Sequence, residues 1–404
     1  MTVAVIGGGA AGLVAAAFAA AGGASVTLVE RTADGGRKIL ISGGGRCNVL
    51  PSVLAPERFV TDSPAHRLRG MLRAWPLNEQ RAFFERDLGI PLSLEAESGK
   101  LFPQSNRAKD IRDGLVAFAR ERGVRMQFGA SVTAVQPAAG AFTVQTSAGD
   151  IEAARVILAT GGLSVPMTGS DGTGLRVAET LGHRMIPTYP ALTPLLGTGH
   201  DSLSGVSLEV RLRSKTGPRA IETSGGFLFT HRGYSGPSVL DISHVVTRPF
   251  EVASGFSRTI RAQWSLLDAA AWEREFEAPS ALVATLVARH VPARLGEQLL
   301  IESGIPLDRR TSSLRRPERL ALIERLTSYA LPVTGDEGYK KAEVTGGGVA
   351  LDEVEPRTLE SRRCAGLYFC GEVLDAFGPI GGHNFSWAWA TGRAAGMAAG
   401  SGKA

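Results

Sequence analysis

Three glycines near the start of the chain have the spacing of a turn that binds a pyrophosphate. Gly7, Gly9 and Gly12 follow an apolar run at residues 3–6 and precede an alanine-rich stretch at residues 13–21. A glycine at the middle position lets a phosphate approach the backbone, and the N-terminus of the following helix offers N–H donors and a partial positive charge. The spacing therefore predicts a strand, a turn and a helix that together bind a dinucleotide.

A carboxylate completes this pattern. A second β-branched run at residues 25–29 ends at Glu30, eighteen residues beyond Gly12. A carboxylate at this position accepts hydrogen bonds from ribose hydroxyls and opposes a 2′-phosphate, which argues against NADP at this site. The pattern favours a dinucleotide site over a glycine-rich turn that only packs against a sheet. By itself it does not separate FAD from NAD.

Further blocks in the chain separate these cofactors through a resemblance. Residues 35–48, which include the glycines of 43–45, resemble the signature of the BaiN/YhiN-like flavoprotein family of NAD(P)/FAD-dependent oxidoreductases and aminoacetone-oxidase-type enzymes. Other blocks of that family follow in order at residues 159–164, 168–174, 229–237, 345–349, 368–375 and 381–385. Residues 379–384 and the two tryptophans Trp387 and Trp389 depart from the commoner pattern, which indicates a divergent subgroup.

The resemblance implies a set of contacts to non-covalently bound FAD. On the adenosine and pyrophosphate side these are Gly7, Gly9, Ala10, Ala11, Gly12, Glu30, Arg37, Lys38 and, through its backbone, Val132. Along the flavin they are Gly44, Arg46, Cys47 and Asn48, at the ribityl chain Gly371, Glu372 and Asp375, and at the isoalloxazine Gly381, Gly382, His383 and Asn384. Thr160 and Gly161 are further expected cofactor contacts. Asn384 is expected near the start of a last helix beginning at about Ser386, where its amide would cap that helix or donate to the flavin edge.

The elements that must position these residues indicate an α/β protein. Strand, turn, helix and strand alternate in the first thirty residues, which is typical of a parallel sheet. The resemblance implies a Rossmann-type FAD-binding domain with a three-layer ββα architecture, interrupted by a β-barrel-like domain and a small helical domain. We place the FAD-binding domain at 1–188 and 341–404, the β-rich insertion at 189–265 and the helical domain at 266–340.

Composition narrows the class of protein further. The net charge is only +5 over 404 residues, so the sequence pI of 9.3 is weak support for nucleic acid, and we do not expect a nucleic-acid partner. Three cysteines without a C-x-x-C pair argue against a disulfide scaffold and a zinc site, and we expect no metal. No apolar run is long enough to cross a bilayer and no signal peptide is evident, so we expect a cytoplasmic protein.

Two histidines are candidates for acid–base catalysis. His231 and His383 are the histidines that fall inside the family blocks, and a histidine bonded only to backbone is an equally good interpretation of each. Cys47 could react with a flavin, but with no second cysteine nearby a small buried packing residue is the better interpretation.

These observations predict an FAD-dependent oxidoreductase that acts on an organic small molecule by hydride transfer through flavin N5. A second strand followed by G-x-G-x-x-G is absent from the sequence, so NAD(P)H, if it is the reductant, visits the flavin transiently. One alternative is an oxidase of small amines such as aminoacetone that passes electrons to oxygen. Another is a flavoprotein that serves RNA modification or binding, for which the basic pI is the support.

Overall fold

In a computed structural model, the chain folds into two units. The structure describes residues 1–216, 219–249, 258–277 and 280–401. The first unit, called the Rossmann unit below, comprises Met1–Tyr189 and Glu343–Ala404. The second, called the inserted unit, is Pro190–Ala342. The finer division of the insertion at residues 265 and 266 stays a prediction.

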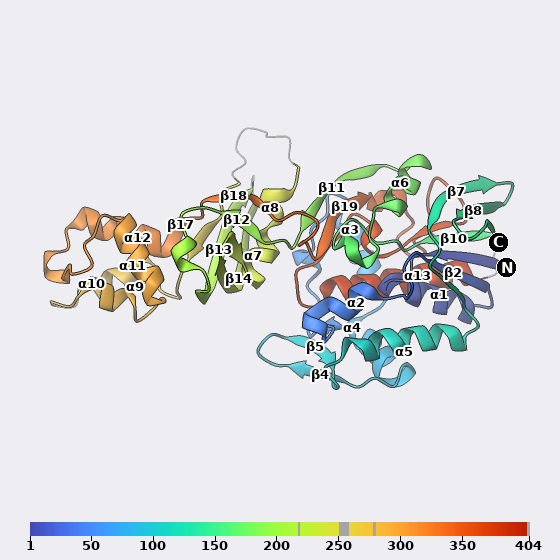
Figure 1. The fold of residues 1–404 in the computed structure, drawn as a ribbon, viewed down its shortest axis with the longest axis horizontal. Coiled ribbons are helices and arrows are strands. Elements are labelled where there is room, and N and C mark those ends of the chain that lie inside the picture. Colours follow the sequence, from blue (N-terminus) through green and yellow to red (C-terminus); the bar gives the residue numbers. More distant parts are fainter. Residues whose placement is uncertain (217–218, 250–257, 278–279, 402–404) are drawn as a thin grey trace. The chain divides into compact units, whose positions relative to one another are not determined.

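A five-stranded parallel sheet forms the centre of the Rossmann unit (Figure 1). Its strands are short and their apolar side chains are buried from both faces, as expected of a parallel sheet covered on both sides. In spatial order the strands are β20 (Leu367–Phe369), β10 (Arg155–Leu158), β1 (Thr2–Ile6), β2 (Ser25–Glu30) and β6 (Arg125–Phe128).

The first and last helices of the chain pack directly on one another (Figure 1). They are α1 (Ala10–Ala21) and α13 (His383–Gly400). A Cβ added at Gly396 of α13 would lie 2.3 Å from the carbonyl oxygen of Ala15, and Gly392 and Gly400 approach α1 as closely. Glycine and alanine therefore line the contact because no larger side chain fits between the two backbones.

Smaller elements surround this core. Three-stranded sheets are formed by β7 (Val132–Ala138), β8 (Ala141–Thr146) and β9 (Ile151–Ala153), and by β3 (Leu50–Pro51), β5 (Lys100–Pro103) and β4 (Leu92–Glu95). A two-stranded sheet pairs β11 (Met185–Ala191) with β19 (Val344–Val349). The other helices are α2 (Arg37–Ile41), α3 (Ala65–Arg73), α4 (Leu77–Ala82), α5 (Ala108–Glu121) and α6 (Thr173–Thr180).

The inserted unit is built on a seven-stranded sheet whose described pairings are all antiparallel. Its strands are β17 (Tyr329–Ala330), β16 (Arg261–Gln263), β13 (Ser207–Thr216), β14 (Arg219–Thr230), β15 (Gly233–Ser235), β12 (Leu195–Gly197) and β18 (Val333–Asp336). Its helices are α7 (Pro237–Ile242), α8 (His244–Thr247), α9 (Ala269–Phe276), α10 (Val283–Val287), α11 (Ala293–Glu302) and α12 (Arg316–Ser328). A separate core that includes Trp264 and Trp272 holds sheet and helices together.

The predicted fold class is confirmed: a parallel Rossmann-type sheet carries an additional antiparallel sheet. One boundary was predicted wrongly, because α13 begins at His383 rather than near Ser386. Gly382, with φ +90°, is the residue that precedes the helix. Among the helices of the described residues, none combines the length and apolarity that a membrane crossing requires.

The close contact of α1 and α13 generates a stability prediction. Gly396→Ala should lower the free energy of unfolding by about 1–3 kcal/mol, because the added methyl group overpacks against backbone that cannot move locally. Gly70 in α3 is a matched control, since a Cβ added there meets nothing within 4 Å. Gly70→Ala should change stability by between zero and a gain of about 1 kcal/mol. Denaturant unfolding followed by circular dichroism measures both, and equal stability of the two variants would contradict the packing.

Candidate functional site

A cavity of about 410 Å³ lies where the parallel strands of the Rossmann unit end. Gly7 follows β1, Glu30 ends β2, Thr160 comes shortly after β10 and Gly371 comes shortly after β20, and all four line it. Ligands of open α/β sheets bind at the carboxyl ends of the strands, where neighbouring strands connect in opposite directions. The predicted contacts that line this cavity are Gly7, Gly9, Ala10, Ala11, Glu30, Arg37, Lys38, Gly44, Asn48, Thr160, Gly161, Gly371, Glu372, Gly381, Gly382 and Asn384.

The turn before α1 leaves room for a ligand. Gly9 precedes the helix with φ −78° and ψ −167°, an extended conformation open to any residue. A Cβ added at Gly9 would meet nothing within 4 Å, so neither the backbone conformation nor neighbouring atoms require glycine here, and the space beside it is open. Gly12 differs: its added Cβ would lie 1.8 Å from the Gly7 carbonyl oxygen, and Gly12 is not among the lining residues. Its role in the structure is close packing of the turn.

The start of α1 supplies positive potential to this cavity. No side chain caps the helix and its first turn has no acidic residue. The first N–H groups of a helix have no partner within the helix, and Ala10 and Ala11 carry two of these groups at the cavity wall. Backbone donors and the helix dipole together suit an anion such as a pyrophosphate.

A second cavity, of about 520 Å³, shares Gly7, Glu30 and Thr160 with the first. Val132 at the start of β7 lines it, as does Arg31 after β2. The carboxylate of Glu30 accepts from the Gly8 N–H at 2.7 Å and from the backbone N–H and hydroxyl of Thr32 at 2.7 and 2.6 Å. An ionised carboxylate has about four acceptor positions, so Glu30 is fixed in place and retains room for a hydroxyl group.

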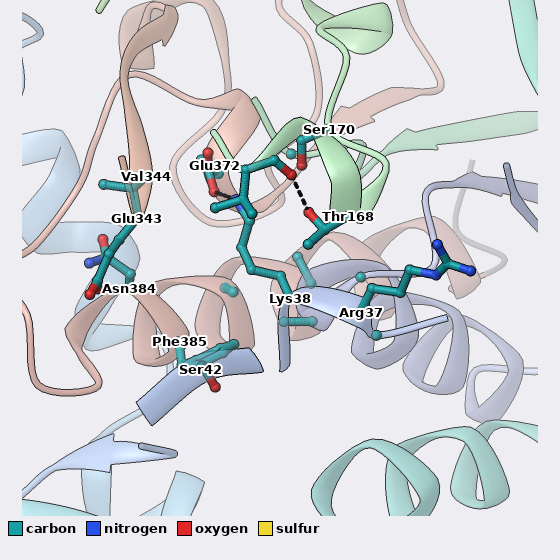
Figure 2. Close-up of a pocket in the computed structure, with 18 of the residues that line it drawn as sticks. Arg37, Lys38, Ser42, Thr168, Ser170, Glu343, Val344, Glu372, Asn384 and Phe385 are labelled. Atoms are coloured by element: carbon teal, nitrogen blue, oxygen red, sulfur yellow. Dashed lines mark hydrogen bonds and ion pairs between the residues drawn. The ribbon is translucent and has the colours of Figure 1, made fainter. Parts of the chain in front are cut away.

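An ion pair stands in the wall of the first cavity (Figure 2). The Lys38 ammonium extends from α2 and donates to Glu372 at 2.9 Å and to the Ser164 hydroxyl at 2.7 Å. The same Glu372 carboxylate accepts from Ser164 at 2.7 Å and from the Thr345 N–H at 3.0 Å. Burial opposes the ionised form, but the Lys38 charge and these hydrogen bonds outweigh it and hold the pKa of Glu372 below its ordinary value.

Lys38 and Arg37 were both expected beside the adenosine, and the structure separates them. Arg37 points away from Lys38 in Figure 2 and donates to Asp34 at 2.8 Å. Lys38 is bound instead to Glu372, which was expected at the ribityl chain. Lys38 is therefore placed with the residues that follow β20.

The turn before α13 is fixed by Asn48. In the orientation that satisfies both ends of its amide, Asn48 accepts from the Gly382 N–H at 3.0 Å and donates to the Leu50 carbonyl at 3.3 Å. Gly382 has φ +90°, and a Cβ added there would lie 2.5 Å from the Leu50 carbonyl carbon. Glycine is thus required at this position by both conformation and space.

Four residues expected at the cofactor do not line the described cavities, and their contacts with FAD stay predictions. Asp375 is buried and accepts from the Thr61 hydroxyl, the Asp62 N–H and both the N–H and hydroxyl of Ser63, so its carboxylate anchors residues 61–63. Arg46 lies over the Phe102 ring at 4.0 Å and pairs with Glu95 at 3.0 Å. Cys47 is buried, and burial raises the pKa of its thiol to about 12. None of Asp375, Arg46, Cys47 and His383 is among the residues that line the two described cavities.

Asn384 lines the cavity wall, but its amide is engaged. It donates to the Gly378 carbonyl and accepts from the Gly378 N–H, both at 2.9 Å. Because α13 begins at His383, Asn384 is inside the helix and does not cap it. The expectation that its amide caps the helix is therefore wrong, because the side chain closes the loop before the helix. The expected contact of Asn384 with the flavin stays a prediction.

The two histidine candidates belong to different units of the chain. His383 is buried against Phe59, and burial together with the nearby Arg58 charge lowers its pKa to about 4, which leaves it uncharged at neutral pH. His231 is exposed in the turn between β14 and β15 of the inserted unit. Neither lines a described cavity. The described residues also contain no cluster of three or more acidic, histidine or cysteine side chains that could hold a metal ion.

The cavity also contains residues that sequence analysis did not assign to the cofactor. Ser164 and Thr345 lie inside the family blocks, and their hydroxyls organise the Glu372 site. Phe385, in the last block, lines the cavity with its ring stacked on Trp389. Lys100 belongs to none of the blocks and also lines the cavity. Its only sequence indication is its position at the start of an apolar run, residues 101–103.

Comparisons with known proteins agree with this geometry. The model of the family described as HI0933-like protein Rossmann domain matches residues 1–398. The chain is 34% identical to the ribosomal RNA dihydrouridine synthase of Escherichia coli (strain K12), over 91% of this chain and 90% of that protein. It is 32% identical to the 3-dehydro-bile acid delta(4,6)-reductase of Clostridium scindens, over 93% of this chain and 92% of that protein.

A solved structure shows the same fold. The 3-ketosteroid-delta4-(5alpha)-dehydrogenase of Rhodococcus jostii RHA1 matches with a TM-score of 0.52 at 15% identity, covering 98% of this chain and 96% of that protein. The match of the family model to nearly the whole chain, together with relatives above 30% identity, shows the family. The chain belongs to the HI0933-like Rossmann flavoprotein family, as its sequence blocks indicated, and is an FAD-dependent oxidoreductase.

Proposed function

We propose that this protein binds FAD along the cavity of the Rossmann unit and uses it to reduce a carbon–carbon double bond conjugated to a carbonyl group, with NAD(P)H as the source of electrons. The observation that carries the choice of reaction is the kind of bond that the two named relatives share. The cavity geometry supports the cofactor part of the proposal. The identity of the substrate rests on the relatives.

The residues present fit FAD. Gly9 leaves open space beside the first N–H groups of α1, where a pyrophosphate would be bound. Glu30 and the Val132 backbone border the second cavity, which suits the adenosine. Gly44 lines the first cavity, and a Cβ added there would also meet nothing within 4 Å. Side chains are thus absent at two points where a bound cofactor would contact backbone.

Lys38 and Glu372 would hold the middle of the cofactor. A lysine ammonium has three N–H donors, and two of those of Lys38 are bound to Ser164 and Glu372. The third is available to a phosphate oxygen or a sugar hydroxyl in the cavity. Because Glu372 keeps the ammonium in one orientation, this donor is positioned before the ligand arrives.

A bound flavin supplies hydride transfer at N5. The net reaction adds two hydrogens to the substrate double bond, one as hydride and one as a proton, and converts NAD(P)H to NAD(P)⁺. The Rossmann unit contributes by fixing the cofactor through backbone donors and by withdrawing Cys47 and His383 from the cavity. The chemistry at the ring then proceeds without a competing thiolate or imidazolium from those residues.

The names of the Escherichia coli and Clostridium scindens relatives both refer to reduction of the same type of double bond. Dihydrouridine is uridine whose ring double bond, conjugated to a carbonyl, has been reduced. A delta(4,6)-reductase of a 3-dehydro-bile acid reduces double bonds conjugated to a ketone. An E. coli relative and a Haemophilus influenzae relative, at 34% and 33% identity, are both named ribosomal RNA dihydrouridine synthases. We therefore place uridine in ribosomal RNA first among the substrates to test, which sets aside our expectation that nucleic acid is not a partner. The small-amine oxidase alternative stays a prediction.

The cofactor part of the proposal has a direct test. Gly9→Val should weaken FAD binding at least 100-fold, because the side chain would occupy the space of the pyrophosphate. The apoprotein should keep its wild-type unfolding temperature, since Gly9 has an extended φ and its added Cβ meets no protein atom within 4 Å. Calorimetric titration of apoprotein with FAD and with FMN measures this. Retention of stoichiometric FAD by a folded Gly9→Val variant would contradict the site.

The reaction is tested by supplying candidate substrates to the FAD-loaded enzyme. With NADH or NADPH, we expect one coenzyme oxidised for each double bond reduced in a ribosomal RNA transcript, with dihydrouridine detected by mass spectrometry of nucleosides. An unsaturated 3-ketosteroid is the second substrate, and aminoacetone with oxygen the third. Gly9→Val protein is the matched control. Peroxide formed from the amine, with no double bond reduced in either other substrate, would favour the amine oxidase and overturn the proposal.

A further inference from the structure

One end of the first cavity combines a free ammonium, backbone donors and an aromatic ring. Lys100 at the start of β5, Gly381 before α13 and Phe385 in its first turn all line this part of the wall. The three residues come from two segments, β5 and the start of α13, that the β3–β5 pair brings together.

Lys100 lies against the turn that begins α13. A Cβ added at Gly381 would lie 3.7 Å from Lys100 Cε and 3.9 Å from its Cγ, so the lysine stem passes over this glycine. Lys100 pairs in register with Pro51 of β3, and Gly382 packs on Leu50 and Pro51 of the same strand. The pairing of β3 with β5 thus holds the Lys100 stem beside the turn that precedes α13.

The charge of Lys100 is felt by its cross-strand neighbour Glu95, but Lys100 is not the hydrogen-bond partner of that carboxylate. Glu95 stands opposite Lys100 in the β4–β5 pair. The Glu95 carboxylate binds Arg46 at 3.0 Å and the Ser98 hydroxyl at 2.5 Å instead. Lys100 itself is half-buried in the wall of the cavity. Its charge is therefore available to a ligand.

The first turn of α13 adds backbone N–H donors, which carry partial positive charge like the Lys100 ammonium. Its first turn carries no acidic residue and no side chain caps it. Asn48 takes the Gly382 N–H, but the N–H groups of the following residues have no partner within the helix. A helix start carries about half a unit of positive charge. Lys100 and the start of α13 both contribute positive charge to the cavity wall, which also includes the carboxylate of Glu343.

The same end offers a flat apolar surface. The Phe385 ring stacks on Trp389 with 5.3 Å between centroids and 8° between planes. Trp389 is fully buried, packs edge-on against Phe84 and donates to the Val49 carbonyl at 3.1 Å. The Phe385 ring is therefore rigid, and it is one of the labelled side chains that line the cavity in Figure 2. A planar ring with a negatively charged edge would satisfy the aromatic surface and the donors together.

We infer that Lys100 binds the pyrimidine edge of the isoalloxazine and raises the reduction potential of the flavin. Two-electron reduction places a hydride equivalent at N5 and a negative charge on the N1 and C2-carbonyl edge. A cation and helix donors at that edge stabilise the reduced form more than the oxidised form. The inference rests on the FAD site proposed above, and it makes Lys100 a positioning and tuning residue rather than a proton donor.

Potentiometry tests this inference independently of substrate. In an anaerobic titration with dithionite and a reference dye, Lys100→Met should lower the ratio of reduced to oxidised flavin at least tenfold at a given potential, which is about 30 mV for a two-electron couple. Lys100→Arg should recover most of this loss because it keeps the charge. Lys109→Met is the matched control, since Lys109 is exposed on α5 and lines neither described cavity; its ratio should equal that of the wild type.

The outcomes separate this inference from the proposed cofactor site. FAD content and affinity are measured for each variant by calorimetry before the titration. An unchanged potential in fully loaded Lys100→Met protein, or an equal shift in Lys109→Met, would overturn the role of Lys100 while leaving the FAD site standing. Failure of the wild-type protein to take up FAD would instead overturn the site itself. An equally lowered flavin reduction potential in Lys100→Met and Lys100→Arg would show that the positive charge of Lys100 is not what raises the potential, and would overturn the inference.

Discussion

The contact between α1 and α13 is the constraint on which the rest of the Rossmann unit depends. Gly392, Gly396 and Gly400 of α13 face Ala11, Ala15 and Ala19 of α1 in the same order, so the two helices run parallel. The residue of α13 that lies level with Ala10, the first residue of α1, is preceded by eight residues of α13. At 1.5 Å per residue, α13 therefore begins about 12 Å beyond the N-terminal end of α1. A chain with bulkier residues at this contact could not place both helix starts beside one cavity.

This stagger gives the cavity two positive ends with different functions. In the proposed site, the start of α1 would meet a group whose negative charge is permanent, a pyrophosphate. The start of α13, with Lys100, would meet a ring edge whose negative charge exists only after reduction. A fixed dipole stabilises whichever state carries the charge, so the same backbone feature would bind the cofactor at one end and adjust its chemistry at the other.

Between these ends, the Glu372 site connects segments that are far apart in the sequence. Lys38 and Glu372 are 334 residues apart, and Ser164 and Thr345 complete the hydrogen bonding. A buried carboxylate without partners would be costly, so this site can form only when α2, the loop after β10, β19 and the segment after β20 are all in place. The cavity is therefore complete only when the segment that follows the inserted unit, from Glu343 onward, has folded onto the N-terminal part of the Rossmann unit.

Features that depend on a local sequence pattern could be predicted from the sequence. The turn at Gly7 to Gly12, the carboxylate of Glu30 and the return of the last segment to the cavity all follow from spacing along one element or from family blocks. Residue type does not reveal which donor a carboxylate or amide meets. Asp375 binds the Ser63 N–H, 312 residues away in the sequence, and Asn384 binds the Gly378 carbonyl six residues before it. These hydrogen bonds could not be predicted from the glycine-rich blocks that contain the two residues, and the cofactor contacts expected of both stay predictions. Lys100 was missed since its importance arises from β3–β5 pairing.

The central claim is that one FAD molecule spans the cavity from the start of α1 to the start of α13. A crystal structure of the protein with FAD tests this most directly. We expect the pyrophosphate within hydrogen-bond distance of the Ala10 and Ala11 N–H groups, the flavin ring next to Phe385, and its pyrimidine edge at the first turn of α13 with the Lys100 ammonium beside it. A flavin ring that lies outside the cavity, or whose pyrimidine edge points away from α13, would contradict the account.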